Sequence, residues 1–110
     1  MDISFGDSKL EKYANDDKKA IKKLGVKRAK LYKVRLDDLR ASDSLEDVRH
    51  LPGRFHELKG NRKGSWACDL DHPYRLIFKP QNTPIPENEH GQYIWQEIEA
   101  VEITEIADYH

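Results

Sequence analysis

The sequence predicts an α+β fold, in which an N-terminal helical hairpin packs on a small antiparallel β-sheet. Two observations predict this class: apolar residues recur every three or four positions through the first 42 residues, and every second position in short segments further on. With 110 residues, of which 37% are hydrophobic and 35% are charged, the chain can form one small core. We therefore expect a single domain over residues 1–110.

The helical hairpin is predicted from two apolar stripes. They comprise Leu10, Tyr13, Ala14, Ile21 and Leu24 in the first helix, and Ala29, Tyr32, Leu36 and Leu39 in the second. Gly25 lies between the stripes and offers the left-handed backbone that commonly ends a helix. In an alternative arrangement, the chain breaks within residues 15–17, and Asp16 or Asp17 caps a longer second helix. Further on, Asp43 and Glu46 have the spacing of a capping box, which predicts a short helix that ends at Pro52-Gly53.

The sheet is predicted from four segments in which apolar and polar residues alternate. They are Phe55–Leu58, Ser65–Leu70, Tyr74–Lys79 and a last strand over about Ile94–Ile106. The alternation slips its phase between residues 98 and 101, which predicts a bulge there. The prolines and asparagines of Pro80–Gly91 predict a surface loop before the last strand. Alternation assigns Trp66 to the core, and Trp95 is expected to be a strand residue or a partner contact.

Charge is distributed unevenly along the chain, although the net charge is only -1. Residues 18–40 contain ten Lys or Arg against two Asp, whereas residues 87–108 contain seven Asp or Glu and no Lys or Arg. A basic segment is typical of nucleic-acid binding, but a solvated helix face gives the same pattern. The single cysteine, Cys68, excludes an internal disulfide. No signal sequence and no apolar run of roughly 20 residues is visible, so we expect a cytoplasmic protein with no membrane partner.

Three stretches of the sequence resemble the HigB family of toxins, a branch of the RelE/ParE superfamily. They are residues 51–64 (LPGRFHELKGNRKG), residues 69–78 (DLDHPYRLIF) and the terminal Asp108-Tyr109-His110. The resemblance extends from about Ala29 to the C-terminus and implies the compact RelE-like fold. The sequence departs from the family at Glu57, where many relatives have proline, and in the loop at residues 80–91, which shorter members lack.

The resemblance also implies a function. It is that of the toxin of a type II toxin-antitoxin system, a metal-independent endoribonuclease that cleaves mRNA on the ribosome and inhibits translation. The implied partners are the ribosome with its rRNA, mRNA, and a helix-turn-helix antitoxin that resembles HigA. No cofactor is implied.

Metal-free RNA cleavage needs a base for the ribose 2'-hydroxyl, a cation for the charge that develops on the phosphate, and an acid for the leaving 5'-oxygen. His56 and His110 are candidates for proton transfer, because a histidine titrates near cellular pH. Arg75 is the candidate cation, and Asp108 and Tyr109 are candidates for a base, an orienting carboxylate or a base-stacking surface. We expect these five residues to converge on one face of the sheet.

Structural alternatives exist for three of these candidates. His56 has the position of an ordinary surface histidine on a strand, and His110 that of an uninformative chain end. Arg75 could form a structural ion pair with Asp69 or Asp71. Alternation along the strand turns Glu57 away from His56, so we expect no influence of that carboxylate on the histidine.

The RNA-binding candidates form two groups. Lys59, Arg62 and Lys63 surround a glycine-rich turn, where cations can approach a phosphate closely, and Lys59 is expected beside the catalytic residues. The second group consists of Lys22, Lys23, Lys27 and Lys30. An ordinary hairpin turn and a solvated helix face explain the two groups equally well.

We expect neither the acidic last strand nor a metal ion to take part in this site. The acidic last strand should face away from RNA, because its carboxylates would repel phosphates. The spacing of Cys68 and the histidines matches no structural zinc pattern, so no metal site is expected.

Two other functions are compatible with the sequence. ParE toxins of the same superfamily inhibit DNA gyrase without catalysis, and such a protein needs neither His56 nor His110. A basic RNA-binding module without toxicity needs only the charged segment of residues 18–40. Expression without an antitoxin distinguishes the three functions: growth arrest with cleaved mRNA, growth arrest with intact mRNA and DNA damage, or no arrest.

Overall fold

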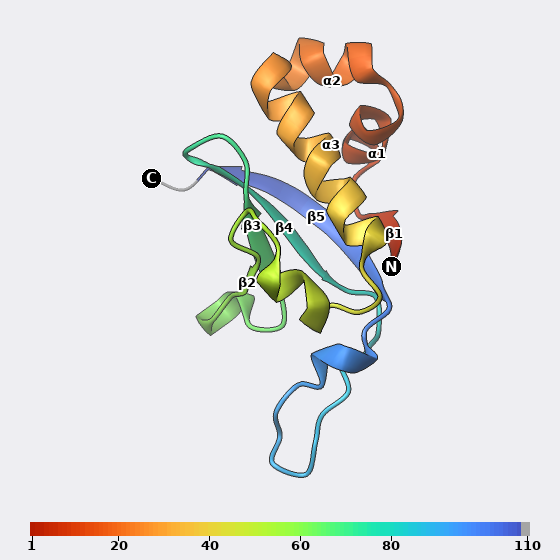
Figure 1. Cartoon of the computed structure of the whole chain (residues 1–110), viewed down its shortest axis with the longest axis vertical. Helices are drawn as coiled ribbons and strands as arrows, with labels where there is room; N and C mark the ends of the chain where they lie inside the picture. The colour runs from red at the N-terminus through yellow and green to blue at the C-terminus, as the bar shows by residue number, and fades with distance from the viewer. Residues whose placement is uncertain (109–110) are drawn as a thin grey trace.

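The computed structural model describes residues 1–108, whose strands form one five-stranded sheet in the order β1-β5-β4-β3-β2 (Figure 1). The strands are β1 (Asp2–Phe5), β2 (His56–Glu57), β3 (Trp66–Asp69), β4 (Tyr74–Pro80) and β5 (Ala100–Asp108). Neighbours from β2 to β5 are antiparallel, whereas β1 is parallel to β5. The predicted α+β class is confirmed, but the sheet is mixed rather than purely antiparallel.

The edge strand β1 is the element that the sequence pattern does not reveal. Only Ile3 and Phe5 alternate there, which is too short a pattern to distinguish a strand from a loop. Its partner is Ala100–Ile103, at the other end of the chain. The pairing is therefore long-range, and no local signal could have predicted it.

Three helices precede the rest of the sheet, so the prediction of a two-helix hairpin is wrong in its number of helices. They are α1 (Ser8–Asn15), α2 (Asp17–Leu24) and α3 (Val26–Ala41). Both of the predicted breaks occur. The side chain of Asp16 accepts a hydrogen bond from the backbone N–H of Lys19 (3.2 Å) and caps α2. Gly25, with φ 84° and ψ 160°, then separates α2 from α3.

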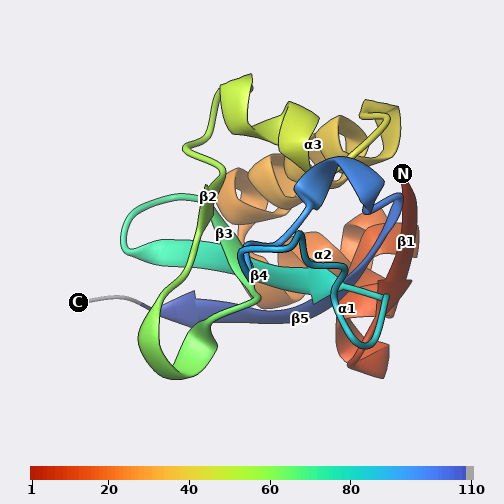
Figure 2. The same cartoon turned by 90° about the horizontal axis from the view of Figure 1, so that it is seen from below.

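The helix α3 covers one face of the sheet (Figures 1 and 2). Its buried residues Tyr32, Leu36 and Leu39 belong to the same core cluster as Leu76 and Phe78 of β4. The hydroxyl of Tyr32 donates a hydrogen bond to the carbonyl of Leu10 (2.8 Å), which ties α3 to α1 inside the core.

Both tryptophans lie in the core. Trp66 of β3 is fully buried, as alternation predicts. Trp95 lies on the short 3-10 helix η3 (Trp95–Glu97), is only 5% exposed, and packs edge-on against Trp66 with 5.4 Å between ring centroids. The expectation that Trp95 is a strand residue or a partner contact is therefore wrong.

The last strand starts later than predicted and has its bulge elsewhere. It begins at Ala100, because residues 95–97 form η3. In the pairing with β4, Ile77 lies opposite Glu105 and Phe78 lies opposite Ile103, so Thr104 is the extra residue. Ile103 and Ile106 are three positions apart, so a regular strand would place them on opposite faces. Because of the bulge, both lie on the core face, opposite Phe78 and Leu76.

Two further 3-10 helices and a long loop complete the chain. The helix η1 (Glu46–His50) occurs where a short helix is predicted, but its N-cap is Leu45, so Asp43 does not cap it. The helix η2 (Gly60–Arg62) forms the turn between β2 and β3. The predicted loop at residues 80–91 projects from the end of the molecule opposite α2 (Figure 1). No helix within residues 1–108 is long and apolar enough to cross a membrane.

Candidate active site

The register of the sheet places His56 and Arg75 on the same face. His56 lies opposite Ala67, which lies opposite Ile77, which lies opposite Glu105. Arg75 is two residues before Ile77 on β4, so its side chain points to the same side. This side is the one without α3, and we call it the open face. His56 and Arg75 are both partly exposed there.

The backbone of the preceding turn fixes the ring of His56. Its Nδ1 lies 2.6 Å from the carbonyl oxygen of Arg54. Because a carbonyl can only accept, Nδ1 must be the donor, and Nε2 remains available. In the neutral ring Nε2 is an acceptor and can take a proton, and in the charged ring it can give one.

Arg75 shares a carboxylate with a second arginine. Asp69 Oδ1 is 3.5 Å from Nε of Arg75, and Asp69 Oδ2 is 3.1 Å from Nε of Arg54. Two guanidinium groups therefore gather around one carboxylate on the open face. The structural alternative for Arg75, an ion pair with Asp69, is present, but it leaves Arg75 partly exposed.

Asp71, the other partner considered for Arg75, is bound elsewhere. It forms a two-pronged ion pair with Arg28 of α3, at 2.9 and 3.2 Å, and this pairing raises the pKa of the Arg28 guanidinium. The guanidinium of Arg28 also lies 3.3 Å from the centroid of the Tyr74 ring. The start of α3 is thus attached to the β3–β4 turn and to the first residue of β4, directly before Arg75.

Glu57 points away from His56. It alternates to the other face, opposite Trp66, and binds Arg49 at 2.9 Å. The prediction that this unusual residue points away from the histidine is confirmed.

The acidic last strand is not separated from the open face. Glu105 lies at the end of the His56 row and pairs with Arg62 at 2.6 Å, and Glu102 pairs with Lys79 at 3.8 Å. Two of the carboxylates expected to face away from RNA therefore lie on the open face, each beside a cation that offsets its charge. This ion pair of Arg62 links the β2–β3 turn to β5.

The C-terminal candidates do not all join His56 and Arg75. Asp108 pairs with Tyr74, and Tyr74 has its ring under Arg28 of α3, so alternation places Asp108 on the face that α3 covers. The expected convergence on one face is wrong for Asp108 in this arrangement. Tyr109 and His110 lie outside the described residues.

The basic candidates occupy two separate regions. Lys59 and Lys63 flank η2 and are exposed, and the amino group of Lys63 lies 5.4 Å from the centroid of the Tyr93 ring. Lys22 and Lys23 lie on α2, and the exposed Lys27 and Lys30 lie on α3. Of the first group, Arg62 reaches the open face through its ion pair with Glu105, whereas Lys59 and Lys63 line a pocket with Glu57 and Tyr93. The structure therefore does not bring Lys59 beside His56 and Arg75, and the second group belongs to the helices.

Sequence reasoning missed two members of the open face, Arg54 and Glu105. Arg54 has a positive φ of 54°, which no simple pattern predicts, and Glu105 reaches its place only because of the bulge at Thr104. Within residues 1–108, no three His, Cys, Asp or Glu side chains gather closely enough to hold a metal ion. Cys68 is fully buried, and burial raises the pKa of its thiol.

Comparison with known proteins identifies the fold and the family. Superposition on the YoeB-YefM complex from Staphylococcus aureus gives a TM-score of 0.60 at 17% identity and covers 100% of this chain and 97% of that chain. The YoeB/ParE toxin from Agrobacterium tumefaciens gives 0.50 at 14% identity, with 100% of both chains covered. The fold is therefore similar to that of these YoeB and ParE toxins.

Sequence similarity then defines the family. The family described as RelE-like toxin of type II toxin-antitoxin system HigB matches residues 3–90, which include His56 and Arg75. Toxin HigB-1 of Vibrio cholerae serotype O1 is 35% identical over 81 residues, covering 72% of this chain and 83% of the relative. The chain belongs to the HigB-like family of type II toxins, the proteins that an antitoxin neutralises.

Proposed function

We propose that this toxin is a metal-independent endoribonuclease that cleaves mRNA on the ribosome. The observation that supports this most directly is the presence of His56 and Arg75 on one open face, with Nε2 of His56 available for proton transfer. A proton-transfer group and a phosphate-binding cation are two of the three groups that the reaction requires.

The proposed reaction is an attack of the ribose 2'-oxygen on the adjacent phosphorus. His56 accepts the 2'-hydroxyl proton at Nε2 as the P–O bond to the 2'-oxygen forms. Arg75, with Arg54 beside it, stabilises the negative charge of the phosphate, and the bond to the 5'-oxygen breaks when an acid supplies a proton. His110 stays the candidate for this acid, and Tyr109 stays a candidate for a base or a base-stacking surface.

The ribosome is the proposed site of action because the described part of the open face supplies few acid-base groups and several cations. Lys59, Arg62 and Lys63 are proposed to bind RNA phosphates next to the scissile bond. The lysines Lys22, Lys23, Lys27 and Lys30 are proposed to bind rRNA. A HigA-like helix-turn-helix protein is the proposed antitoxin.

The test is an mRNA cleavage assay with purified ribosomes. The toxin should cut mRNA on ribosomes and cut naked mRNA poorly, and His56→Ala should slow cleavage by roughly 100- to 10,000-fold. A chain that lacks His110 should be slowed by a similar factor. Circular dichroism and ribosome sedimentation provide the control that each variant is folded and bound.

Several results would count against this function. If His56→Ala and the shortened chain both cleave at the wild-type rate, the proposed catalytic residues are incorrect. If growth arrest occurs with intact mRNA and damaged DNA, the toxin acts on gyrase as ParE toxins do. Efficient cutting of naked mRNA at the same sites would exclude dependence on the ribosome.

A further inference from the structure

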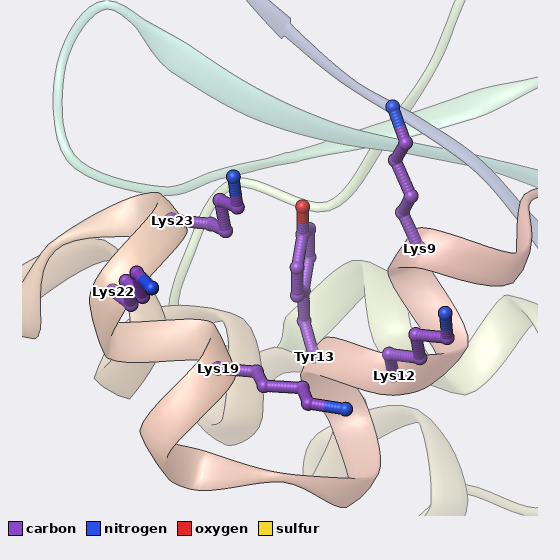
Figure 3. A pocket seen from close by; sticks show the side chains of 6 residues that line it. All are labelled: Lys9, Lys12, Tyr13, Lys19, Lys22 and Lys23. Carbon is purple, nitrogen blue, oxygen red and sulfur yellow. The ribbon is translucent and has the colours of Figure 1, made fainter.

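Five lysines and one tyrosine line a hollow between α1 and α2 (Figure 3). Its volume is about 350 Å³, which is within the usual range for the binding site of a small ligand. The lining residues are Lys9, Lys12 and Tyr13 of α1 and Lys19, Lys22 and Lys23 of α2. None of the residues proposed for catalysis belongs to it.

Helix geometry explains why these side chains gather. Positions 9, 12 and 13 are spaced by three and four residues and share one face of α1, and positions 19, 22 and 23 share one face of α2 in the same way. Asp16 adopts an extended backbone, with φ −140° and ψ 102°, and ends one helix while it caps the next. The break at Asp16 therefore turns the two lysine faces toward a common space.

The positive charge of the hollow is not balanced by the described part of the protein. All five lysines are exposed, and none forms an ion pair with another residue among positions 1–108. By contrast, Lys33 on the neighbouring helix pairs with Asp17 at 3.4 Å. Like charges on adjacent helical turns destabilise a helix slightly, so this arrangement favours an external polyanion.

The tyrosine supplies a flat apolar surface among these charges. Tyr13 is half-buried and packs against the core, while its hydroxyl points in the same direction as the ends of Lys9 and Lys23 (Figure 3). The ring stands between Lys9 and Lys12 on one side and Lys22 and Lys23 on the other. An aromatic ring flanked by cations is the arrangement that binds single-stranded nucleic acid, where bases stack and phosphates are neutralised.

We propose that this hollow binds one unpaired nucleotide of single-stranded RNA, with its base on Tyr13 and the flanking phosphates on the lysines. Lysine is a compact point charge that suits phosphate, whereas carboxylate groups are recognised best by the planar fork of arginine, and the lining contains no arginine. RNA is therefore favoured over an acidic protein segment. The inference rests on the proposed function only for the choice of RNA as the nucleic acid.

The first test uses a matched pair of neighbouring lysines. Lys18 and Lys19 are both exposed on α2, but only Lys19 lines the hollow. The probe is a fluorescently labelled oligoadenylate of about ten nucleotides, measured by anisotropy at several salt concentrations in full-length His56→Ala protein, which prevents cleavage. Lys19→Ala should reduce the slope of log Kd against log salt by about 0.7, the value for one lost phosphate contact on a single strand. Lys18→Ala has the same net charge and should leave the slope unchanged.

The second test separates stacking from charge. Tyr13→Leu keeps an apolar side chain that can pack against the core, and should weaken oligonucleotide binding by roughly 5- to 150-fold because the base loses its platform. Tyr13→Phe keeps the ring and should bind within about twofold of the parent, a difference below 0.5 kcal/mol. Thermal unfolding of both variants controls for stability.

Three results would overturn the inference. They are equal slopes for the Lys18 and Lys19 variants, unchanged affinity for Tyr13→Leu, and displacement of the RNA by an oligoglutamate peptide of equal charge at the same concentration as unlabelled RNA. The last result would assign the hollow to an acidic protein segment. A wild-type protein that binds the oligonucleotide through the hollow but never cleaves mRNA on ribosomes would refute the proposed function alone.

Discussion

Asp69 is the residue that decides how the role of Arg75 should be tested. Its carboxylate lies between Arg54 and Arg75, and the side chains of Asp69 and Arg75 are 32% and 28% exposed. An ion pair this exposed contributes only about 0–1 kcal/mol. If Arg75 only stabilises the structure, replacing Arg75 and replacing Asp69 should lower the rate of mRNA cleavage by similar factors. If Arg75 binds the phosphate, replacing Arg75 should lower that rate far more than replacing Asp69.

We predict that Arg75→Ala and Asp69→Asn differ strongly in activity. Arg75→Ala should slow mRNA cleavage by about 100- to 1000-fold, because a group that stabilises the developing charge is lost. Asp69→Asn keeps the size of the side chain and removes two partly exposed ion pairs of low energy, to Arg54 and to Arg75, so it should change the rate less than about fivefold. Single-turnover cleavage on ribosomes measures both rates. Equal losses in the two variants would show that Arg75 serves the structure.

The sequence identified candidate residues of this site by their chemical type, but it predicted the positions of only some of them. His56 and Arg75 could be predicted to share one face because strand alternation is a local property, and the register places both on the same face. The place of Asp108 depends on the bulge at Thr104, which changes the phase of β5 relative to β4. A bulge forms where two strands meet, so the sequence of one strand alone does not locate it.

At the scale of elements, the two breaks between the first three helices determine the shape of the helical layer. Asp16 breaks the chain by capping, since its side chain satisfies a backbone N–H of the next helix. Gly25 breaks it by conformation, because φ 84° with ψ 160° is a region that essentially only glycine occupies. The sequence offered these two breaks as alternatives. Both occur in the structure, because each has its own physical cause.

We predict that Gly25→Ala destabilises the protein by about 1–3 kcal/mol. No atom lies within 4 Å of a Cβ built at this position, so the whole effect should come from backbone strain rather than from a steric clash. Urea denaturation followed by circular dichroism measures the free energy of unfolding. Lys27→Ala, on the exposed first turn of α3, is the control and should lie within about 0.5 kcal/mol of the wild type. A Gly25→Ala protein as stable as this control would contradict the assigned conformation.

The sequence predicted some strands of the sheet well and missed others. In β3 and β4, apolar and polar residues alternate between flanking turn residues, and both strands begin and end within about a residue of their predicted limits. The strand β1 and the start of β5 were missed because they depend on each other: Asp2 pairs with Ala100, and Phe5 with Ile103. Such contacts between the two ends of the chain are not visible to a local pattern.

At the scale of the whole molecule, two buried ionisable groups connect stability to pH. Burial raises the pKa of the Tyr32 hydroxyl above its ordinary value of 10.0 and that of the Cys68 thiol above its ordinary value of 9.0. Both groups are neutral in the folded core, whereas the unfolded chain can ionise them at alkaline pH. The stability that depends on their neutral forms is therefore complete below pH 9 and is lost as the pH rises further.

We predict a fall in the free energy of unfolding above pH 9 that these two residues cause. Each group should contribute a slope of about 1.4 kcal/mol per pH unit once the pH exceeds its ordinary pKa. Urea denaturation between pH 8 and 10.5 measures the slope, and Cys68→Ala and Tyr32→Phe should each make it shallower. Tyr32→Phe also loses a buried hydrogen bond, so its stability should be about 1 kcal/mol lower than that of the wild type below pH 9. Identical slopes in wild type and both variants would be inconsistent with the burial described.

The attachment of Arg28 to Asp71 and Tyr74 has a consequence for how this toxin can be controlled. It makes the first turn of α3 and the start of β4 one continuous block, and Arg75 is the next residue along that strand. A protein that binds α3 and shifts Arg28 must also shift the arginine that is proposed to hold the scissile phosphate. Thermodynamic linkage makes such an effect reciprocal: if that protein lowers the affinity for RNA by some factor, RNA lowers the affinity for that protein by the same factor. An inhibitor of this kind could silence the toxin from the far side of the sheet, and a sufficient concentration of substrate would drive it off.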